Sequence, residues 1–425
     1  MERVDTIVIG GGQAGLATSY VLAERRRPHV VLERSRIAES WHTHRWDSFT
    51  LVGPNWTCTL PGHSYAGPDP DGYMRREELI GFFDSYARSF DAPVREGTAA
   101  HRLSREVGGG FVVETDRGTF AASHVVVATG PYQRPKTPPA ASAIDGRVMQ
   151  LHTDDYRNPA QLPAGAVVVV GSGQSGCQIA EELREAGRTV YLSTGGCGWF
   201  PRRHRGKDNV WWRDRMGFFE RTVDTLLSPA DRMASVPIQT GKDGGHDINL
   251  RTLAARGVIL AGRFVRAERT RLLFAPDLEA NLKRSDDIAR SLVAEIDEFI
   301  SRSGIAAPPE DRDLFATPYV ARVDQVDLVR DGVSAVIWAT GYTLDFGWVD
   351  IPVFDKYGYP VQRRGVTDVP GLYFIGLHWM HTRKSGLIWG VGDDARHIVG
   401  HLTSPQGRDP LAAQDRSADT GAALP

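Results

Sequence analysis

The segment VDTIVIGGGQAGLATSYVLAERRRPHVVLE at residues 4–33 decides the fold, because it reads as a strand, a glycine turn, a helix and a second strand. In a dinucleotide-binding unit of this kind, Gly10 permits the tight turn, Gly12 lets a pyrophosphate approach the backbone, and Gly15 lets the helix pack on the strand. The first N–H groups of the helix then face the phosphates. Glu33 ends the second strand, where its carboxylate can accept hydrogen bonds from the ribose hydroxyls of an adenosine. The segment predicts a complete adenosine-diphosphate site.

The same order of elements returns at residues 166–193, AVVVVGSGQSGCQIAEELREAGRTVYLS. The residues of this second turn that we expect to face a dinucleotide are Gly171, Gly173, Gln174, Ser175 and Gly176. Two such units predict an α/β protein with two Rossmann-like dinucleotide-binding domains, each built around a parallel sheet.

The second unit differs from the first at the end of its second strand. Ser193 and Thr194 offer hydroxyl groups there, and no acidic residue is present to repel a 2′-phosphate. The following stretch PRRHRGK at 201–207 brings Arg202 and Arg203, whose guanidinium groups suit a phosphate dianion. The second site is therefore predicted to bind NADPH rather than NADH. The alternative interpretation of the basic stretch is a solvated surface loop.

Composition and charge exclude several classes of protein. Hydrophobic residues make up 41% and charged residues 24% of the 425 residues, as in ordinary globular proteins, and the formal net charge of −2 gives no reason to expect nucleic acid. The three cysteines show no CxxC or CxxxxC spacing, so a local redox dithiol and a zinc knuckle are not expected. No histidine motif predicts a metal. Without a signal peptide or a long apolar run, we expect a soluble, cytoplasmic protein that does not bind membranes.

Additional motifs link the chain to a known family. Two strands end in the sequence Ala-Thr-Gly, at 128–130 and at 339–341, and the linker DGRVMQLHTDDYR occupies 145–157. With the paired glycine turns, these features resemble the single-component flavin-dependent, NADPH-using monooxygenases, which include flavin-containing monooxygenases, plant auxin-synthesis enzymes and Baeyer–Villiger enzymes. The family linker pattern FxGxxxHxxx is matched only approximately, because Ile144 replaces its Phe and the spacing to His152 is longer. Tyr156 stands where Baeyer–Villiger enzymes usually have Trp, which favours heteroatom hydroxylation.

The resemblance implies two cofactors, FAD and NADPH, and a set of residues around them. It implies that the segment 40–56 lines the flavin, with Trp41 and Arg45 near the dinucleotide and Asn55 near the isoalloxazine. Ordinary packing of the tryptophans and a turn-forming role for Asn55 after Pro54 are the alternatives. It further implies cofactor contacts at the strand-end and late glycines, namely Gly130, Gly341, Gly376 and Gly392. A helix that begins near Gly392 would direct its N-terminus toward the flavin.

The predicted domain organisation follows from the same units. We expect an FAD domain at 1–158 plus 320–402, an NADPH domain with a substrate-shaping helical insert at 159–319, and a flexible tail at 403–425. The late strands within 334–342 and 371–376 are expected to return to the FAD domain.

The family mechanism would be hydride transfer from NADPH to FAD, formation of a C4a-(hydro)peroxide with O2, and oxygen transfer to a small organic substrate. N- or S-hydroxylation is the first expectation and Baeyer–Villiger oxygenation the second. A flavin reductase or oxidase that inserts no oxygen, and a non-catalytic nucleotide sensor, are the further alternatives. Neither the substrate nor the oligomeric state follows from the sequence.

Overall fold

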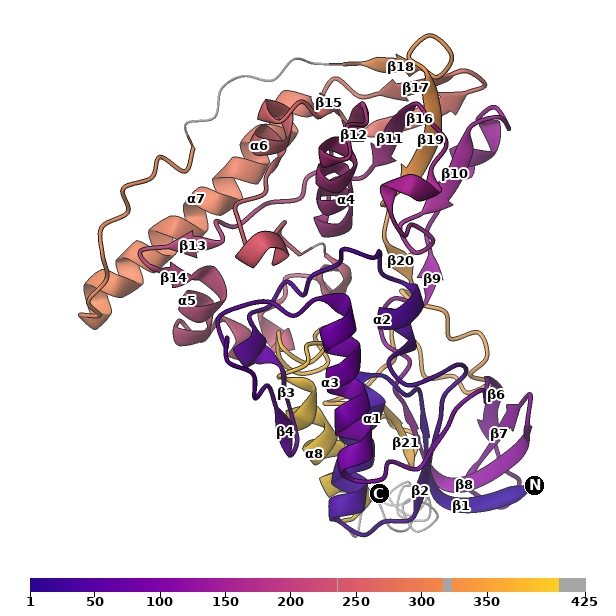
Figure 1. Cartoon of the computed structure of the whole chain (residues 1–425). Coiled ribbons are helices and arrows are strands. Elements are labelled where there is room, and N and C mark those ends of the chain that lie inside the picture. The colour runs from indigo at the N-terminus through magenta and orange to yellow at the C-terminus, as the bar shows by residue number, and fades with distance from the viewer. Residues whose placement is uncertain (235, 316–322, 405–425) are drawn as a thin grey trace, which may run out of the picture.

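The computed structural model describes residues 1–234, 236–315 and 323–404, and Figure 1 shows two α/β bodies joined by crossing segments. The predicted tail from 405 and the predicted boundary at 320 lie outside the described residues. In the described part of the chain no helix combines the length and apolar character needed to cross a membrane.

The first body is built on a mixed sheet with the strand order β5-β2-β1-β8-β7-β6. Strand β8 is central: β1 runs parallel to it on one side, and on the other side its first half pairs with β7 and its last residues with β21. The strands are β1 (Glu2–Ile9), β2 (His29–Leu32), β5 (Val94–Arg95), β6 (Ala100–Arg105), β7 (Phe111–Thr115), β8 (Gly118–Val127) and β21 (Leu372–Phe374). The return of β21 to this sheet confirms one of the two expectations for the late strands.

Helices α1 (Gln13–Glu24), α3 (Arg76–Ser89) and α8 (Val391–Leu402) contribute apolar side chains to one core of this body, while α2 (Glu39–Thr43) lies beside α3. The predicted helix after the first glycine turn is confirmed by α1. Short antiparallel pairs complete the surroundings, namely β3 (Thr59–Leu60) with β4 (His63–Ser64) and β9 (Arg134–Pro135) with β20 (Tyr342–Thr343).

The second body contains an all-parallel sheet with the order β10-β19-β11-β12-β15. Its strands are β10 (Met149–His152), β11 (Ala166–Val170), β12 (Val190–Ser193), β15 (Ile259–Ala261) and β19 (Val333–Trp338). The assignment of the 334–342 strand to the first domain is wrong, because β19 lies between β10 and β11. Five of its six residues are buried, so its apolar run fills the centre of a sheet that is covered on both faces.

The second domain consequently includes residues on both sides of the expected range 159–319. Strand β10 precedes residue 159 and β19 follows residue 319, yet both belong to the second sheet. The two crossings between the bodies run beside each other, since β9 and β20 pair antiparallel. Figure 1 shows this pair between the two bodies.

The second body also carries helices α4 (Gln174–Glu185), α5 (Asn209–Arg215), α6 (Leu250–Ala255) and α7 (Leu278–Ser303). Helices α5, α6 and α7 lie within the range 159–319 for which a helical insert was expected. The remaining strands form the hairpin β13 (Arg203–His204) with β14 (Lys207–Asp208) and the antiparallel sheet β16 (Phe264–Glu268), β17 (Arg271–Phe274) and β18 (Gln325–Asp327). Short 3₁₀ turns occur at 55–57, 139–143, 159–161, 218–220, 223–225, 229–233 and 242–244.

Candidate dinucleotide sites and the cleft between them

The first glycine turn has the geometry of a phosphate cradle. Gly10 has a φ of +114°, and a Cβ there would lie 2.6 Å from the carbonyl oxygen of Ala128. A Cβ at Gly15 would lie 1.8 Å from the carbonyl oxygen of Gly10. A Cβ at Gly12, in contrast, would meet nothing within 4 Å. The two outer glycines are therefore required by packing, while the middle one borders open space of the kind a pyrophosphate needs.

The carboxylate of Glu33 is held against this turn. Its Oε2 accepts a hydrogen bond of 2.6 Å from the N–H of Gly11, and its Oε1 accepts one of 2.9 Å from the N–H of Ser35. The residue is buried, at 7% exposure. An oriented carboxylate beside the turn fits the ribose of an adenosine dinucleotide.

The second turn repeats this geometry. A Cβ at Gly171 would lie 2.4 Å from the carbonyl oxygen of Ala339, and one at Gly176 would lie 1.9 Å from that of Gly171. Gly173 again borders open space. Two predicted residues of the following helix have different surroundings: Gln174 donates to the carbonyl of Pro237 at 3.0 Å, and Ser175 is partly exposed in the first turn.

The N-termini of α1 and α4 differ from those of the other described α-helices, which have a side-chain cap or an acidic residue in the first turn. Neither has a side-chain cap or an acidic residue in its first turn. Asp208 caps α5 and Asn249 caps α6 through side-chain hydrogen bonds. The free N–H groups at the start of each helix can therefore bind the pyrophosphate of a dinucleotide next to the open middle glycine. The residues at the two turns thus suit both predicted cofactors.

The hydroxyl groups at the end of β12 bond to the neighbouring strand. Ser193 donates to the carbonyl of Gly262 at 3.0 Å, and Thr194 donates to that of Ala261 at 2.8 Å. Both side chains are buried. The next turn instead lies against helix α7: a Cβ at Gly196 would be 2.9 Å from Nη1 of Arg284. Arg284 is exposed, and sequence reasoning missed it because the contact joins segments far apart in the chain.

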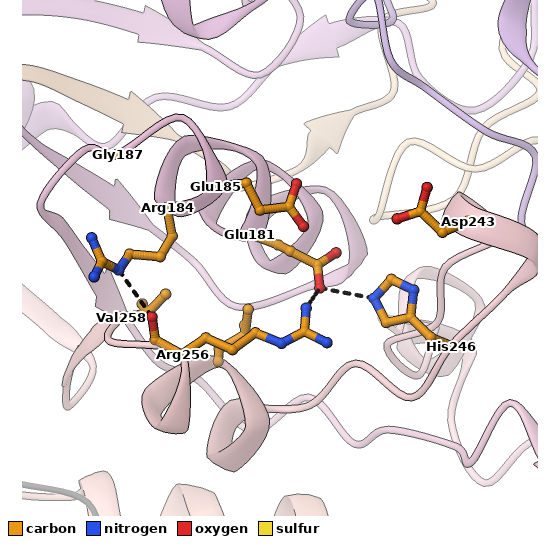
Figure 2. Close-up of a pocket in the computed structure, with 9 residues that line it drawn as sticks. Glu181, Arg184, Glu185, Gly187, Asp243, His246, Arg256 and Val258 are labelled. Atoms are coloured by element: carbon orange, nitrogen blue, oxygen red, sulfur yellow. Dashed lines mark hydrogen bonds and ion pairs between the residues drawn. The ribbon is translucent and has the colours of Figure 1, made fainter.

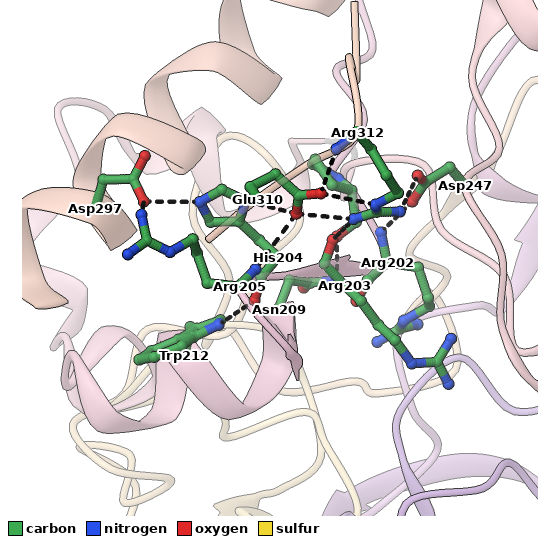
Figure 3. Close-up of polar contacts among 11 residues, drawn as sticks. Arg202, Arg203, His204, Arg205, Asn209, Trp212, Asp247, Asp297, Glu310 and Arg312 are labelled. Carbon is green, nitrogen blue, oxygen red and sulfur yellow. Dashed lines mark hydrogen bonds and ion pairs between the residues drawn. The ribbon is translucent and has the colours of Figure 1, made fainter. Parts of the chain in front are cut away.

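The basic stretch 201–207 has contacts within the protein, as Figure 3 shows. Arg202 is 1% exposed, donates to Asp208 at 2.5 Å and to the carbonyl of Val52 at 2.8 Å, and lies over the ring of Tyr73. Arg203 donates at 2.7 Å to each of two glycine carbonyls, at 244 and 245. The expectation that these two side chains are available to a 2′-phosphate needs correction, because the β13–β14 hairpin folds back and pairs them with protein acceptors.

Trp41 and Arg45 lie in contact with each other in the first body. The Arg45 guanidinium is 5.1 Å from the centre of the Trp41 ring and 5.8 Å from that of Tyr132. Tyr132 follows Gly130, the predicted strand-end glycine. The structure thus brings Trp41 and Arg45 together beside Tyr132, while their predicted place near the dinucleotide stays a prediction.

Asn55 is buried in the short turn after Pro54. Its Nδ2 donates to the carbonyl of Asp69 at 2.9 Å, and its Oδ1 accepts from the N–H of Met74 at 2.7 Å. These contacts match the turn-forming alternative: the side chain holds the loop between Asp69 and Met74.

The linker before the second turn joins the two domains. Tyr156 is fully buried in the core of the second domain and donates to Glu182 at 2.6 Å. His152 contacts the carbonyl of Gly341 at 3.0 Å through Nε2, and Tyr342 donates to Asp154 at 2.8 Å. The linker therefore fixes the second Ala-Thr-Gly strand end, and Tyr156 belongs to the core of the second domain.

The C-terminal segment 378–390 contacts the first dinucleotide helix. Gln13 donates to the carbonyl of Gly386 at 2.9 Å. A Cβ at Gly376 would lie 2.6 Å from that of Ala14, and one at Gly392 would lie 3.0 Å from Pro61. Helix α8 begins at Val391, one residue before the predicted start.

The cysteines do not form a redox site. All three are buried, and burial raises the pKa of Cys58 to about 12 and that of Cys177 well above its usual value. A thiol that must react as a thiolate needs the opposite environment. Within the described residues, no group of three or more His, Cys, Asp or Glu side chains could hold a metal ion.

One pocket of about 690 Å³ lies beside the second half of α4 (Figure 2). Glu181 occupies its wall and pairs with His246 at 2.8 Å and with Arg256, while Lys242 pairs with Glu185. The attraction of Glu181 raises the pKa of His246. The pocket lies away from both glycine turns, so we assign no cofactor to it.

Comparisons with known proteins agree with this architecture. Residues 7–215 match the family described as pyridine nucleotide-disulphide oxidoreductase. The chain is 35% identical over 402 residues to a Geobacillus kaustophilus protein named "Uncharacterized oxidoreductase CzcO-like", covering 94% of this chain and 98% of that one. It is also 30% identical over 182 residues to the indole-3-pyruvate monooxygenase YUCCA1 of Oryza sativa subsp. japonica, covering 42% and 44% of the two chains.

A similar solved structure is a flavin-containing monooxygenase from Stenotrophomonas maltophilia, with a TM-score of 0.63 and 22% identity, covering 95% of this chain and 99% of that one. This likeness confirms the predicted α/β class with two Rossmann-like domains. The sequence likeness to the plant monooxygenase, which covers 42% of this chain, agrees with the resemblance that the motifs indicated.

Proposed function

The chain belongs to the CzcO-like family of oxidoreductases, and on that premise we propose that it is an FAD- and NADPH-dependent monooxygenase acting on a small organic substrate. The observation that carries the proposal is the pair of equivalent glycine turns, each bordering open space at its middle glycine and each followed by an uncapped helix. The burial of all three cysteines supports oxygen rather than a disulfide as the electron acceptor.

The first turn would hold the FAD pyrophosphate at Gly12, with Glu33 accepting from the ribose hydroxyls. The second turn would hold the NADPH pyrophosphate at Gly173, with Arg284 beside Gly196 as the candidate for the 2′-phosphate. Bound FAD would supply hydride acceptance and the activation of O2. In the overall reaction, NADPH, a proton, O2 and the substrate would give NADP⁺, water and a product that carries one oxygen atom more than the substrate.

The residues between the domains would exclude water from the reaction. The rings of Trp56 and Trp389 are 5.3 Å apart, and the ring of Phe219, from the inserted segment, is 4.7 Å from that of Trp389. Asn55 precedes Trp56 and fixes the loop to which both belong. We therefore propose Asn55 as a positioning residue of this wall, acting through Trp56.

Oxygenation of a nitrogen or sulfur atom is the first candidate reaction and Baeyer–Villiger oxygenation the second. NADPH oxidation and O2 uptake are measured with amines, thioethers, indoles and ketones, and the products are weighed by mass spectrometry. We expect FAD in the purified protein and a product 16 mass units heavier from one substrate class, which is the mass of one oxygen atom. A protein that binds no FAD, or that never incorporates oxygen, would contradict the proposal.

A further inference from the structure

We propose that the substrate carries a carboxylate on an aromatic body and that Arg213 binds this carboxylate. This inference rests on the proposed monooxygenase function and names the class of substrate for the same cleft. Arg213 belongs to the short helix α5 of the inserted segment.

Arg213 is buried among aromatic rings. Its residue exposure is 5%, and its guanidinium carbon is 4.9, 5.3 and 5.0 Å from the ring centres of Phe200, Phe218 and Phe219. Rings in this position attract a cation weakly compared with a carboxylate, and they offer no hydrogen-bond acceptor in their plane. The guanidinium is therefore shielded from water without being neutralised.

No anionic partner for Arg213 occurs among the described residues, and its Nε is buried without a hydrogen bond. Asp208 is the carboxylate that acts on it electrostatically, but Asp208 already accepts from Arg202 and from Tyr73, each at 2.5 Å. Burial and the neighbouring Arg202 and Arg383 lower the pKa of Arg213 to about 9. An uncompensated buried cation is costly, so this arrangement favours an anion supplied from outside the chain.

A second arginine next to Arg213 carries the same charge. Arg383 lies over the ring of Trp379 at 5.4 Å, and burial lowers its pKa. Burial and the charge of Arg383 lower the pKa of His378 to about 4. We call Arg213 and Arg383 the cationic cluster, beside which His378 stays neutral. The cluster unites an α5 residue with a residue of the C-terminal segment, and it concentrates positive potential at one place.

The cationic cluster lies where the inserted segment meets the flavin domain. Thr222 pairs with Thr382 in an antiparallel bridge, and the N–H of Arg383 donates to the carbonyl of Arg221 at 2.9 Å. Gly386, in the same C-terminal segment, accepts from Gln13 at the start of α1. A ligand held by Arg213 would thus lie between the insert and the first dinucleotide turn, beside the aromatic wall formed by Trp56, Trp389 and Phe219.

The test uses equilibrium binding and needs no turnover. The FAD-loaded protein, without NADPH, is titrated calorimetrically with naphthalene-2-carboxylate and with the neutral naphthalene-2-carboxamide. We expect the wild-type protein to bind the carboxylate at least ~10-fold more tightly than the amide, as a charge-assisted bidentate contact provides. Arg213→Met should abolish this preference and Arg213→Lys should restore part of it.

Two controls separate this role from a structural one. Arg215→Met makes the same change at an exposed residue of the same helix and should leave the preference unchanged. Arg213→Met should retain or raise the melting temperature of the FAD-loaded protein, because it removes an unpaired buried charge. A purely structural arginine would give the opposite shift.

Three results would overturn the inference: equal or absent binding of the two probes by the wild-type protein, an unchanged preference in Arg213→Met, or a loss of NADP⁺ affinity in that variant while carboxylate binding persists. The last result would assign the cationic cluster to the coenzyme. FAD content and NADPH-dependent flavin reduction are measured on the same samples. If these remain normal while carboxylate binding fails, only the substrate inference is lost and the proposed function stands.

Discussion

The carboxylate of Glu33 accepts a hydrogen bond of 2.6 Å from the backbone N–H of Gly11, so the acidic end of β2 is tied to the turn that precedes α1. The turn and the acid are thereby oriented before any ligand binds. Replacing Glu33 with Ala should weaken FAD binding by about 2 kcal/mol, because a charged hydrogen-bond acceptor for the ribose is lost and the N–H of Gly11 loses its partner. The dissociation constant of FAD from the apoprotein measures this. An unchanged constant would remove Glu33 from the site.

Gly12→Asp should abolish FAD binding while preserving the fold. A Cβ at this position meets nothing within 4 Å, so the damage would come from a side chain and a negative charge placed against the pyrophosphate. Fluorescence of released flavin and far-ultraviolet circular dichroism check the two halves of this prediction. Gly173→Asp is the matched variant: it should keep FAD and lose NADPH. If both variants retained both ligands, the two turns would not be phosphate sites.

Arg284→Gln should change coenzyme preference. The side chain lies beside Gly196 after β12, where a 2′-phosphate would be recognised, so the KM for NADPH should rise ~10-fold or more while that for NADH stays constant. Arg203→Gln serves as the control, because its donors bond to backbone carbonyls at 244 and 245. Equal effects on the two coenzymes would mean that Arg284 does not contact the phosphate.

Arg202→Met should destabilise the protein by about 3 kcal/mol, since it removes one partner of a buried ion pair and leaves Asp208 undercompensated. It also removes the bond to the carbonyl of Val52, which connects the hairpin to the segment 40–56. Urea unfolding of the FAD-loaded variant measures the loss. A stability equal to that of the wild type would show that Arg202 is not an anchor.

Stability should fall as the pH decreases from about 6.5 to about 4. The folded protein holds His378 neutral, with a pKa lowered to about 4 by burial and by Arg383, whereas the unfolded chain binds a proton near pH 6.5. Between these pH values the unfolded state therefore binds more protons than the folded state. Protonation of this residue lowers the free energy of unfolding by at most about 3 kcal/mol. His378→Gln should lose less stability between pH 7 and pH 4.5 than the wild type. Parallel stability curves would contradict this.

The features that the sequence predicted correctly are those formed by residues close together in the chain. Gly10 and Gly15 approach each other within one turn, so their spacing in the sequence is enough to predict the turn. Glu33 lies at the end of the next strand, and its position can be predicted in the same way. The buried apolar residues of α7 also recur at helical spacing along the chain. Elements with short-range contacts could therefore be assigned without the structure.

Long-range contacts could not be assigned in this way. Two strands end in Ala-Thr-Gly, and both have a similar apolar sequence. The residues of β19 alone therefore do not determine that it pairs with β11 rather than with a strand of the first sheet. Arg202 was expected to bind a phosphate, but its guanidinium donates to Asp208 and to the carbonyl of Val52, the latter from a distant segment. Arg284 went unnoticed for the same reason, since the face of a long helix that meets Gly196 is set by tertiary packing.

Incorporation of isotopic oxygen distinguishes a monooxygenase from an oxidase. The FAD-loaded protein is given NADPH and ¹⁸O₂ with the panel of amines, thioethers, indoles and ketones, and NADPH oxidation, hydrogen peroxide and product mass are measured together. We expect one substrate class to gain a single ¹⁸O atom for each NADPH oxidised, with little hydrogen peroxide formed. Unlabelled substrates throughout the panel, with one hydrogen peroxide formed for each NADPH, would contradict it and identify the protein as an oxidase.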